Sequence, residues 1–284
     1  MSTDFTTLVT PQQLFARLGA PDWVVVDCRH DLANPDFGRA AYAKGHIPGA
    51  RFLHLDDDLS GPRTGTNGRH PLPDPQTLAA RLGDIGIDNT TQVVAYDDAG
   101  GMYAARLWWL LNWLGHSRVA VLDGGFRAWC SDLQVLDRHV PAATPKAFAP
   151  ALQALSVDVD HVLTHCRSDA MTLIDARSPD RYRGENETID PVGGHIPGAI
   201  NRFFKDNLRP DGRFKPADQL RREFDTLLAG RDPCCVVHQC GSGVTACHNL
   251  LAMQIAGLPG ARLYPGSWSE WCADSARAVA RGAQ

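Results

Sequence analysis

One six-residue block occurs twice in this chain. Gly45–Ala50 reads Gly-His-Ile-Pro-Gly-Ala, and Gly194–Ala199 repeats it letter for letter. Upstream of each block an Asp-x-Arg triplet closes a short apolar run, at Asp27–Arg29 and again at Asp175–Arg177. The separation between the triplets matches the separation between the blocks to within one residue. Such a repeat predicts two homologous domains in tandem.

The ends of the two halves also correspond. Gly124–Trp129 and Gly266–Trp271 share a glycine-led pattern that ends in tryptophan. Between the halves lies a stretch that is rich in Pro and Ala and has no clean period, as expected for an extended linker. We therefore place a first domain at 1–140, a linker at 141–156 and a second domain at 157–284.

Within each half, short apolar runs alternate with helical patterns. In the first half we expect strands near 23–27, 93–97 and 118–122, and helices near 11–18, 75–83 and 102–114. This alternation predicts the α/β class, with a mostly parallel sheet and helices on both faces. Ligands of such folds bind beyond the carboxyl ends of the strands.

Composition excludes several classes of protein. The chain of 284 residues is 44% hydrophobic, and Lys+Arg 28 against Asp+Glu 32 gives a net charge of −4, which argues against a nucleic-acid or membrane surface. No stretch approaches the roughly 20 apolar residues of a membrane span. The N-terminus lacks a basic start and an apolar core, so we expect no export signal and a cytoplasmic location. The eight cysteines contain no CxxC pair, and we expect reduced thiols without a metal.

One cysteine stands between a strand-like run and a helix-like run. The run Val236–Gln239 is followed by Cys240, a loop with Gly241 and Gly243, and an apolar helical pattern. Glycines let such a loop curl until several backbone N–H groups face one point, and the helix adds its positive end. These surroundings stabilise a thiolate. In the first half Asp97 stands at the corresponding place, and a carboxylate cannot carry sulfur, so we expect that domain to be non-catalytic.

Together these motifs resemble the rhodanese superfamily in its tandem-domain form, over nearly the whole chain. The loop Cys240–Thr245 resembles the active-site loop of the 3-mercaptopyruvate sulfurtransferases within it. Members that prefer thiosulfate typically carry basic residues directly after the cysteine, where this chain has Gly241 and Ser242. Because thiosulfate is a dianion, a neutral loop favours a donor with one more distant carboxylate.

The resemblance implies roles for particular residues. Cys240 is expected to be the nucleophile and persulfide carrier, and Ser242, His70 and Asp58 a hydroxyl–imidazole–carboxylate relay. Arg181 is expected to bind the substrate carboxylate. The remaining loop residues, expected to contact the transferred sulfur, are Gly241, Gly243, Val244 and Thr245. The family's second carboxylate-binding arginine has no counterpart in Glu187–Pro191, and Arg183 is the alternative that the sequence offers.

The expected reaction is a ping-pong transfer of sulfur from 3-mercaptopyruvate to a thiol such as thioredoxin, or to cyanide, without a cofactor. Thiosulfate as donor to the same cysteine is the alternative. A cysteine phosphatase shares the strand–Cys–loop–helix design but needs an arginine at the position of Ala246. A non-catalytic binding module is a third alternative, which the intact cysteine loop disfavours.

Overall fold

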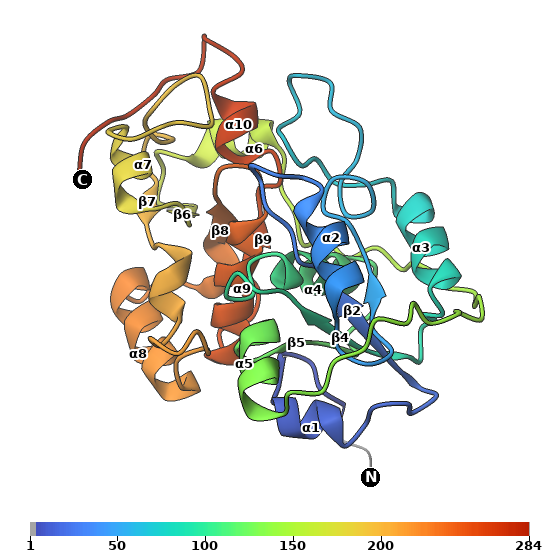
Figure 1. Cartoon of the computed structure of the whole chain (residues 1–284). Coiled ribbons are helices and arrows are strands. Elements are labelled where there is room, and N and C mark those ends of the chain that lie inside the picture. The colour runs from blue at the N-terminus through green and yellow to red at the C-terminus, as the bar shows by residue number, and fades with distance from the viewer. Residues whose placement is uncertain (1–3, 284) are drawn as a thin grey trace. The chain divides into compact units, whose positions relative to one another are not determined.

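The computed structural model describes residues 4–283 and divides into two compact units. The first unit comprises the chain up to residue 61 together with 73–154 and 210–214. The second unit comprises 62–72, 155–209 and the chain from 215 on. Each unit is a parallel sheet with helices packed against it (Figure 1), so the predicted fold class is confirmed. The segments 62–72 and 210–214 depart from the linear division expected from the repeat.

The sheet of the first unit has five parallel strands in the order β1-β5-β4-β2-β3. Its centre is β2 beside β4, two β-branched runs with Val25 opposite Val94, and both residues are buried. The strands predicted near 23–27, 93–97 and 118–122 are confirmed to within one residue. The strand bounds are β1 Leu8–Val9, β2 Trp23–Asp27, β3 Arg51–Phe52, β4 Gln92–Tyr96 and β5 Val119–Leu122.

Helices lie against this sheet. Leu14, Tyr42 and Trp129 bring three helices into one apolar core with the strands, whereas α4 is buried almost all round because its sequence is apolar all round. The predicted helices are confirmed: those expected at 11–18 and 102–114 are shorter in the structure, and the one expected at 75–83 extends one residue further. Their bounds are α1 Pro11–Phe15, α2 Phe37–Lys44, α3 Pro75–Asp84, α4 Ala104–Trp113 and α5 Gly125–Asp132.

The sheet of the second unit has four parallel strands in the order β7-β6-β8-β9. Asp175 at the end of β6 lies opposite Gln239 at the end of β8, so both strands finish at the same edge. The next residue after β8 is Cys240. The strand bounds are β6 Thr172–Asp175, β7 Ile200–Asn201, β8 Val236–Gln239 and β9 Arg262–Leu263.

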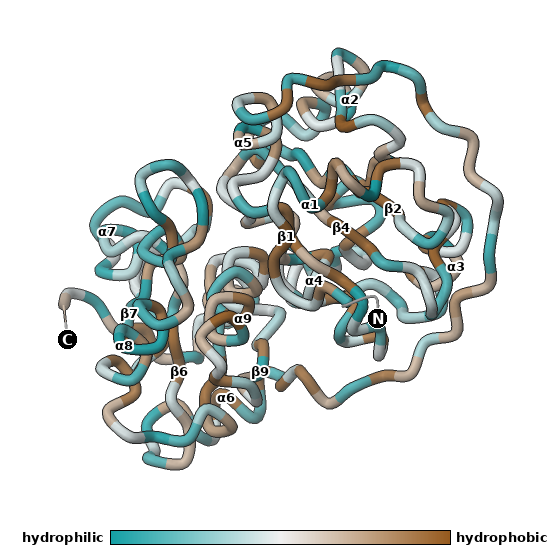
Figure 2. The backbone as a smooth tube through the Cα atoms, turned by 90° about the horizontal axis from the view of Figure 1, so that it is seen from below, coloured by the Kyte–Doolittle hydropathy of each residue, from teal (hydrophilic) through white to brown (hydrophobic). Residues whose placement is uncertain are grey.

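Helices pack on both faces of this sheet, because successive residues of a strand point to opposite faces. Val237 belongs to the core that contains Tyr182 and Trp268, while its neighbour His238 contacts Met253 of α9 on the opposite face. The apolar residues of β6 and α9 are brown in Figure 2. The helix bounds are α6 Val159–His165, α7 Pro179–Arg183, α8 Ala217–Leu228, α9 Thr245–Ile255 and α10 Ser267–Trp271, with short 3₁₀ turns η1 Phe204–Asn207 and η2 Pro233–Cys235.

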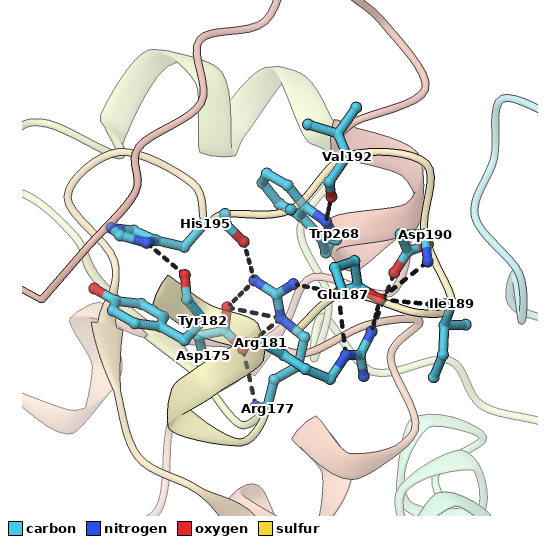
Figure 3. A network of polar contacts seen from close by, with 12 residues as sticks. Asp175, Arg177, Arg181, Tyr182, Glu187, Ile189, Asp190, Val192, His195 and Trp268 are labelled. Carbon is cyan, nitrogen blue, oxygen red and sulfur yellow. Dashed lines mark hydrogen bonds and ion pairs between the residues drawn. The ribbon is translucent and has the colours of Figure 1, made fainter. Parts of the chain in front are cut away.

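The repeated sequence motifs form the scaffold at the carboxyl edge of each sheet. Arg177 is ion-paired with Asp175 at 2.6 Å and donates to the carbonyl of Gly194 at 2.8 Å. His195 stacks on Tyr182 with ring centroids 3.8 Å apart (Figure 3). These contacts tie the strand end to the turn that follows, which is why the triplet and the block recur together. The first unit repeats them with Asp27, Arg29, Gly45, Tyr42 and His46.

All eight cysteines are free thiols. Within residues 4–283, no helix has the length and apolar character needed to cross a bilayer.

Candidate active site

The cysteine loop joins β8 to α9 in the second unit. Cys240 is 2% exposed, and its carbonyl accepts a hydrogen bond from the N–H of Trp268 at 3.0 Å. The carbonyl of Gly241 accepts likewise from Ser269 at 2.9 Å. In a trans peptide the N–H points away from the C=O, so the N–H groups of Gly241 and Ser242 are turned away from α10.

These amides are available to a ligand. In the part of the chain that the structure describes, the N–H groups of Gly241, Ser242, Val244 and Thr245 have no hydrogen-bond acceptor. The last two lie at the start of α9, where the helix dipole is positive. The loop therefore forms a polar cradle suited to an anion.

The two glycines of the loop are needed for different reasons. Gly243 has a φ of +76°, and a Cβ there would lie 2.4 Å from the backbone oxygen of Pro265. Gly241 has an ordinary φ, but a Cβ there would lie 2.9 Å from Nη2 of Arg69 and 3.6 Å from Nη2 of Arg181. Gly241 thus leaves room for two guanidinium groups.

The first unit holds a carboxylate in the equivalent place. Asp97 follows β4 and is completely buried, and its two oxygens accept four backbone N–H groups at 2.8–2.9 Å. Burial raises the pKa of Asp97, and the four donors oppose that shift. The loop that follows the central strand is thus an anion cradle in this fold.

A serine and a histidine meet beside the cysteine loop. Nδ1 of His70 lies 2.7 Å from Oγ of Ser242, and both side chains are buried. His70 belongs to the segment 62–72, which is anchored within the second unit because the N–H of Arg69 donates to Oγ of Ser269 at 3.0 Å. The structure therefore brings together two of the residues predicted for the relay.

The third predicted relay residue, Asp58, belongs to the first unit. One of its oxygens accepts the backbone N–H of His54 and the other accepts Nε of Arg81, both at 2.7 Å. The ion pair between Asp58 and Arg81 is not predicted by any motif of the sequence. The relay role of Asp58 stays a prediction.

Arg181, predicted to bind the substrate, is held in a network of buried carboxylates (Figure 3). Its Nε and Nη2 donate to Glu187 at 3.1 and 2.8 Å, and Nη2 also donates to Asp190 at 3.3 Å. Glu187 accepts the N–H groups of Ile189 and Asp190 as well. Burial acts to raise the pKa of Glu187, but the hydrogen bonds from Arg181 and these amides outweigh it and lower the pKa.

Arg69 is the residue that sequence reasoning missed. Its Nη1 forms an ion pair with Asp190, which places a second guanidinium beside Gly241. Burial, together with the neighbouring Glu187, raises the pKa of Asp190 against the opposing charges of Arg69 and Arg181. Arg183, the alternative second arginine, is paired instead with the exposed Glu185 at 2.7 Å. The available signal was position, because Arg69 directly precedes His70.

One other cluster contains metal-ligand types of side chain. His30, His54 and Asp56 in the first unit each place a potential ligand atom within 4.8 Å of the others. However, Nδ1 of His54 accepts the N–H of Asp56 at 3.2 Å, and its Nε2 donates to the carbonyl of Pro35 at 2.9 Å. A metal ion would have to displace these hydrogen bonds, so the cluster is not a preformed metal site.

Comparison with known proteins places this geometry in a family. The rhodanese-like domain matches the chain twice, at residues 10–132 and 158–274. The chain belongs to the rhodanese family. Both copies match because the scaffold motifs recur in both units, and the second match contains the cysteine loop.

Similar rhodanese proteins are known from several organisms. The chain is 50% identical over 278 residues to a "Probable 3-mercaptopyruvate sulfurtransferase" of Pseudomonas aeruginosa, covering 97% of this chain and 98% of the relative. It is 35% identical to the thiosulfate sulfurtransferase of Mus musculus, covering 90% and 86%. The solved structure of 3-mercaptopyruvate sulfurtransferase from Leishmania major has a TM-score of 0.83 at 31% identity, covering 94% of this chain and 74% of that one.

Proposed function

We propose that this protein is a sulfurtransferase that takes sulfur from 3-mercaptopyruvate onto Cys240 and passes it to a thiol acceptor. The observation that carries the proposal is the uncharged cradle Gly241–Thr245, with amides open to an anion, beside the Ser242–His70 hydrogen bond. Relatives named for both donors are similar to this chain over most of its length. The choice of 3-mercaptopyruvate therefore rests on the uncharged residues of the loop.

In the first half-reaction the Cys240 thiolate attacks the sulfur of 3-mercaptopyruvate. The S–S bond forms, the bond between sulfur and C3 breaks, and its electron pair remains on C3 as the enolate of pyruvate. C3 then needs one proton to give pyruvate, and the thiol of the donor releases one proton, so the step is balanced. Ser242 and His70 are placed to relay it, since Oγ of Ser242 and Nδ1 of His70 lie within hydrogen-bond distance, 2.7 Å apart. Asp58 is the third member that the proposal assigns to this relay.

The persulfide anion then rests against the loop amides. Hydrogen bonds from the N–H groups of Gly241 and Ser242 and from the start of α9 stabilise its outer sulfur, in the manner of an oxyanion hole. In this proposal Gly243, Val244 and Thr245 shape the rest of that cradle.

In the second half-reaction a nucleophilic acceptor, either a thiolate or cyanide, attacks the outer sulfur and Cys240 leaves as the thiolate. Thioredoxin, a small thiol or cyanide fits this step, because each is a nucleophile for sulfur. None of the eight cysteines forms a disulfide, which fits a reducing cytoplasm.

Thiosulfate is the second candidate donor, and one observation favours it. Two guanidinium groups lie beside Gly241, and a dianion would be stabilised by both. The same cysteine would then carry the sulfur, with sulfite as the leaving group.

The test is to find the covalent intermediate. Protein treated with each donor and digested should gain about 32 Da, one sulfur atom, on the peptide that bears Cys240. Cys234, which is exposed, is the internal control and should gain none. The ratio of kcat/KM for 3-mercaptopyruvate and thiosulfate, measured with cyanide, then decides the donor. Turnover that persists in Cys240→Ser, or without the added mass, contradicts the proposal.

A further inference from the structure

We propose that Arg69 is the second cation that binds the carboxylate of the sulfur donor, and that Arg69 and Arg181 act together as a clamp. This inference rests on the proposed function and names how its substrate is held. It assigns to segment 62–72 a binding residue in place of the arginine that is missing from Glu187–Pro191.

The first argument is the position of the two guanidinium groups. Both approach the same point, because a Cβ on Gly241 would lie within 4 Å of Nη2 of Arg69 and of Nη1 and Nη2 of Arg181. Gly241 directly follows the nucleophile, so an anion held there has its remaining atoms near Cys240. The side chains of Arg69 and Arg181 are 23% and 19% exposed, which leaves them reachable from solvent.

The second argument is which donors remain unused. Arg181 gives Nε and Nη2 to Glu187 and Asp190, and Arg69 gives Nη1 to Asp190. Among the described residues, no acceptor contacts Nη1 of Arg181 or Nη2 of Arg69. Both unused nitrogens lie within 4 Å of the Cβ position of Gly241, at 3.7 Å for Nη1 of Arg181 and 2.9 Å for Nη2 of Arg69. The carboxylates of the protein thus fix one edge of each guanidinium and leave the other edge for a ligand.

The third argument is the shared counter-ion. Asp190 pairs with both arginines and its side chain is 3% exposed, so it holds two like charges at a fixed separation. Glu187 orients Arg181 from the other side. An incoming carboxylate therefore meets two positioned donors at a small cost in side-chain entropy.

The rival reading is that the pair of Arg69 and Asp190 only attaches segment 62–72 to the second unit. Two variants separate these readings, because Arg69→Gln and Asp190→Asn break the same ion pair. Arg69→Gln removes a guanidinium from the clamp. Asp190→Asn keeps both guanidinium groups in the clamp, and the amide oxygen of the new side chain can still accept hydrogen bonds from them.

The experiment measures KM and kcat for 3-mercaptopyruvate in wild type, Arg69→Gln, Asp190→Asn and the control Arg183→Gln, whose guanidinium is paired with exposed Glu185. Loss of one charge-assisted contact should raise KM about 10- to 100-fold in Arg69→Gln, with a much smaller change in kcat. Asp190→Asn weakens the positioning but removes no donor, so its KM should rise by less than about 10-fold, and Arg183→Gln should match wild type. A KM that rises equally in Arg69→Gln and Asp190→Asn, or that is unchanged in Arg69→Gln, overturns the proposal.

A binding measurement keeps this test separate from the proposed function. Pyruvate, which carries the same carboxylate, should protect Cys240 from iodoacetamide in wild type, and half-protection should need about 10-fold more pyruvate in Arg69→Gln. If no donor forms a persulfide, the proposed function fails while the protection assay still decides the role of Arg69. If the persulfide forms and protection is identical in both proteins, only the clamp fails.

Discussion

Replacing the two glycines of the cysteine loop by alanine, one at a time, should give opposite results. In Gly243→Ala the residue is forced to keep a φ of +76°, which costs about 1–2 kcal/mol, and its Cβ would lie 2.4 Å from the backbone oxygen of Pro265. Relieving such a contact adds about 1–3 kcal/mol, so we expect a loss of about 2–5 kcal/mol in the free energy of unfolding. In Gly241→Ala the φ is ordinary and the close atom is the flexible end of Arg69, so the loss should stay below about 1 kcal/mol.

Gly241→Ala should lower activity strongly although it changes stability little. Its new methyl group displaces the guanidinium groups of Arg69 and Arg181, and the loss of one charge-assisted contact lowers kcat/KM for 3-mercaptopyruvate about 10- to 100-fold. Urea unfolding followed by tryptophan fluorescence gives the stability, and donor kinetics on the folded variants give the activity. If Gly241→Ala is as unstable as Gly243→Ala, or keeps the full kcat/KM, the geometry drawn from this loop is refuted.

Two further predictions concern the relay and a surface ion pair. Ser242→Ala should lower kcat by about 100-fold or more, because proton transfer is lost, while iodoacetamide still labels Cys240; unchanged turnover would exclude the relay. Hydrogen bonds from Lys215 and Arg202 to Glu223 overcome the opposing effect of burial and lower its pKa from 4.5 to about 2. Since the folded-state pKa is the lower one, this stabilisation is present above about pH 4.5 and is lost as the pH falls toward 2. In acid titrations of stability Glu223→Gln should lack that pH dependence, and an unchanged acid limb would contradict the assignment.

The sequence predicted the parts of this fold that repeat or alternate. The strands around Val25 and Val94 follow from β-branched runs, and the scaffold follows from two copies of one motif. Helix ends were less predictable. The helix expected from residue 102 begins at Ala104, because the N–H groups of Tyr103 and Ala104 are bound by the Asp97 carboxylate.

The site shows the same division. Cys240 and its loop could be read from local pattern, since the strand, the glycines and the helix are contiguous. Arg69 could not, because its contacts with Asp190 and with the space beside Gly241 join residues far apart in the chain. In the sequence, the segment Glu187–Pro191 has acidic residues and lacks the second carboxylate-binding arginine that the family resemblance led us to expect. In the folded chain they position the arginines.

The Asp97 loop has a consequence for the second unit. In the first unit the Asp97 carboxylate accepts hydrogen bonds from four backbone N–H groups, so these donors are satisfied without a ligand. In the second unit the amides of the cysteine loop gain an acceptor, in the proposed mechanism, when Cys240 carries the persulfide sulfur. The loaded form should therefore resist heat better than the resting form, by the same linkage that makes any tight ligand a stabiliser. Each turnover would then alternate between a more stable persulfide form and a less stable free-thiol form.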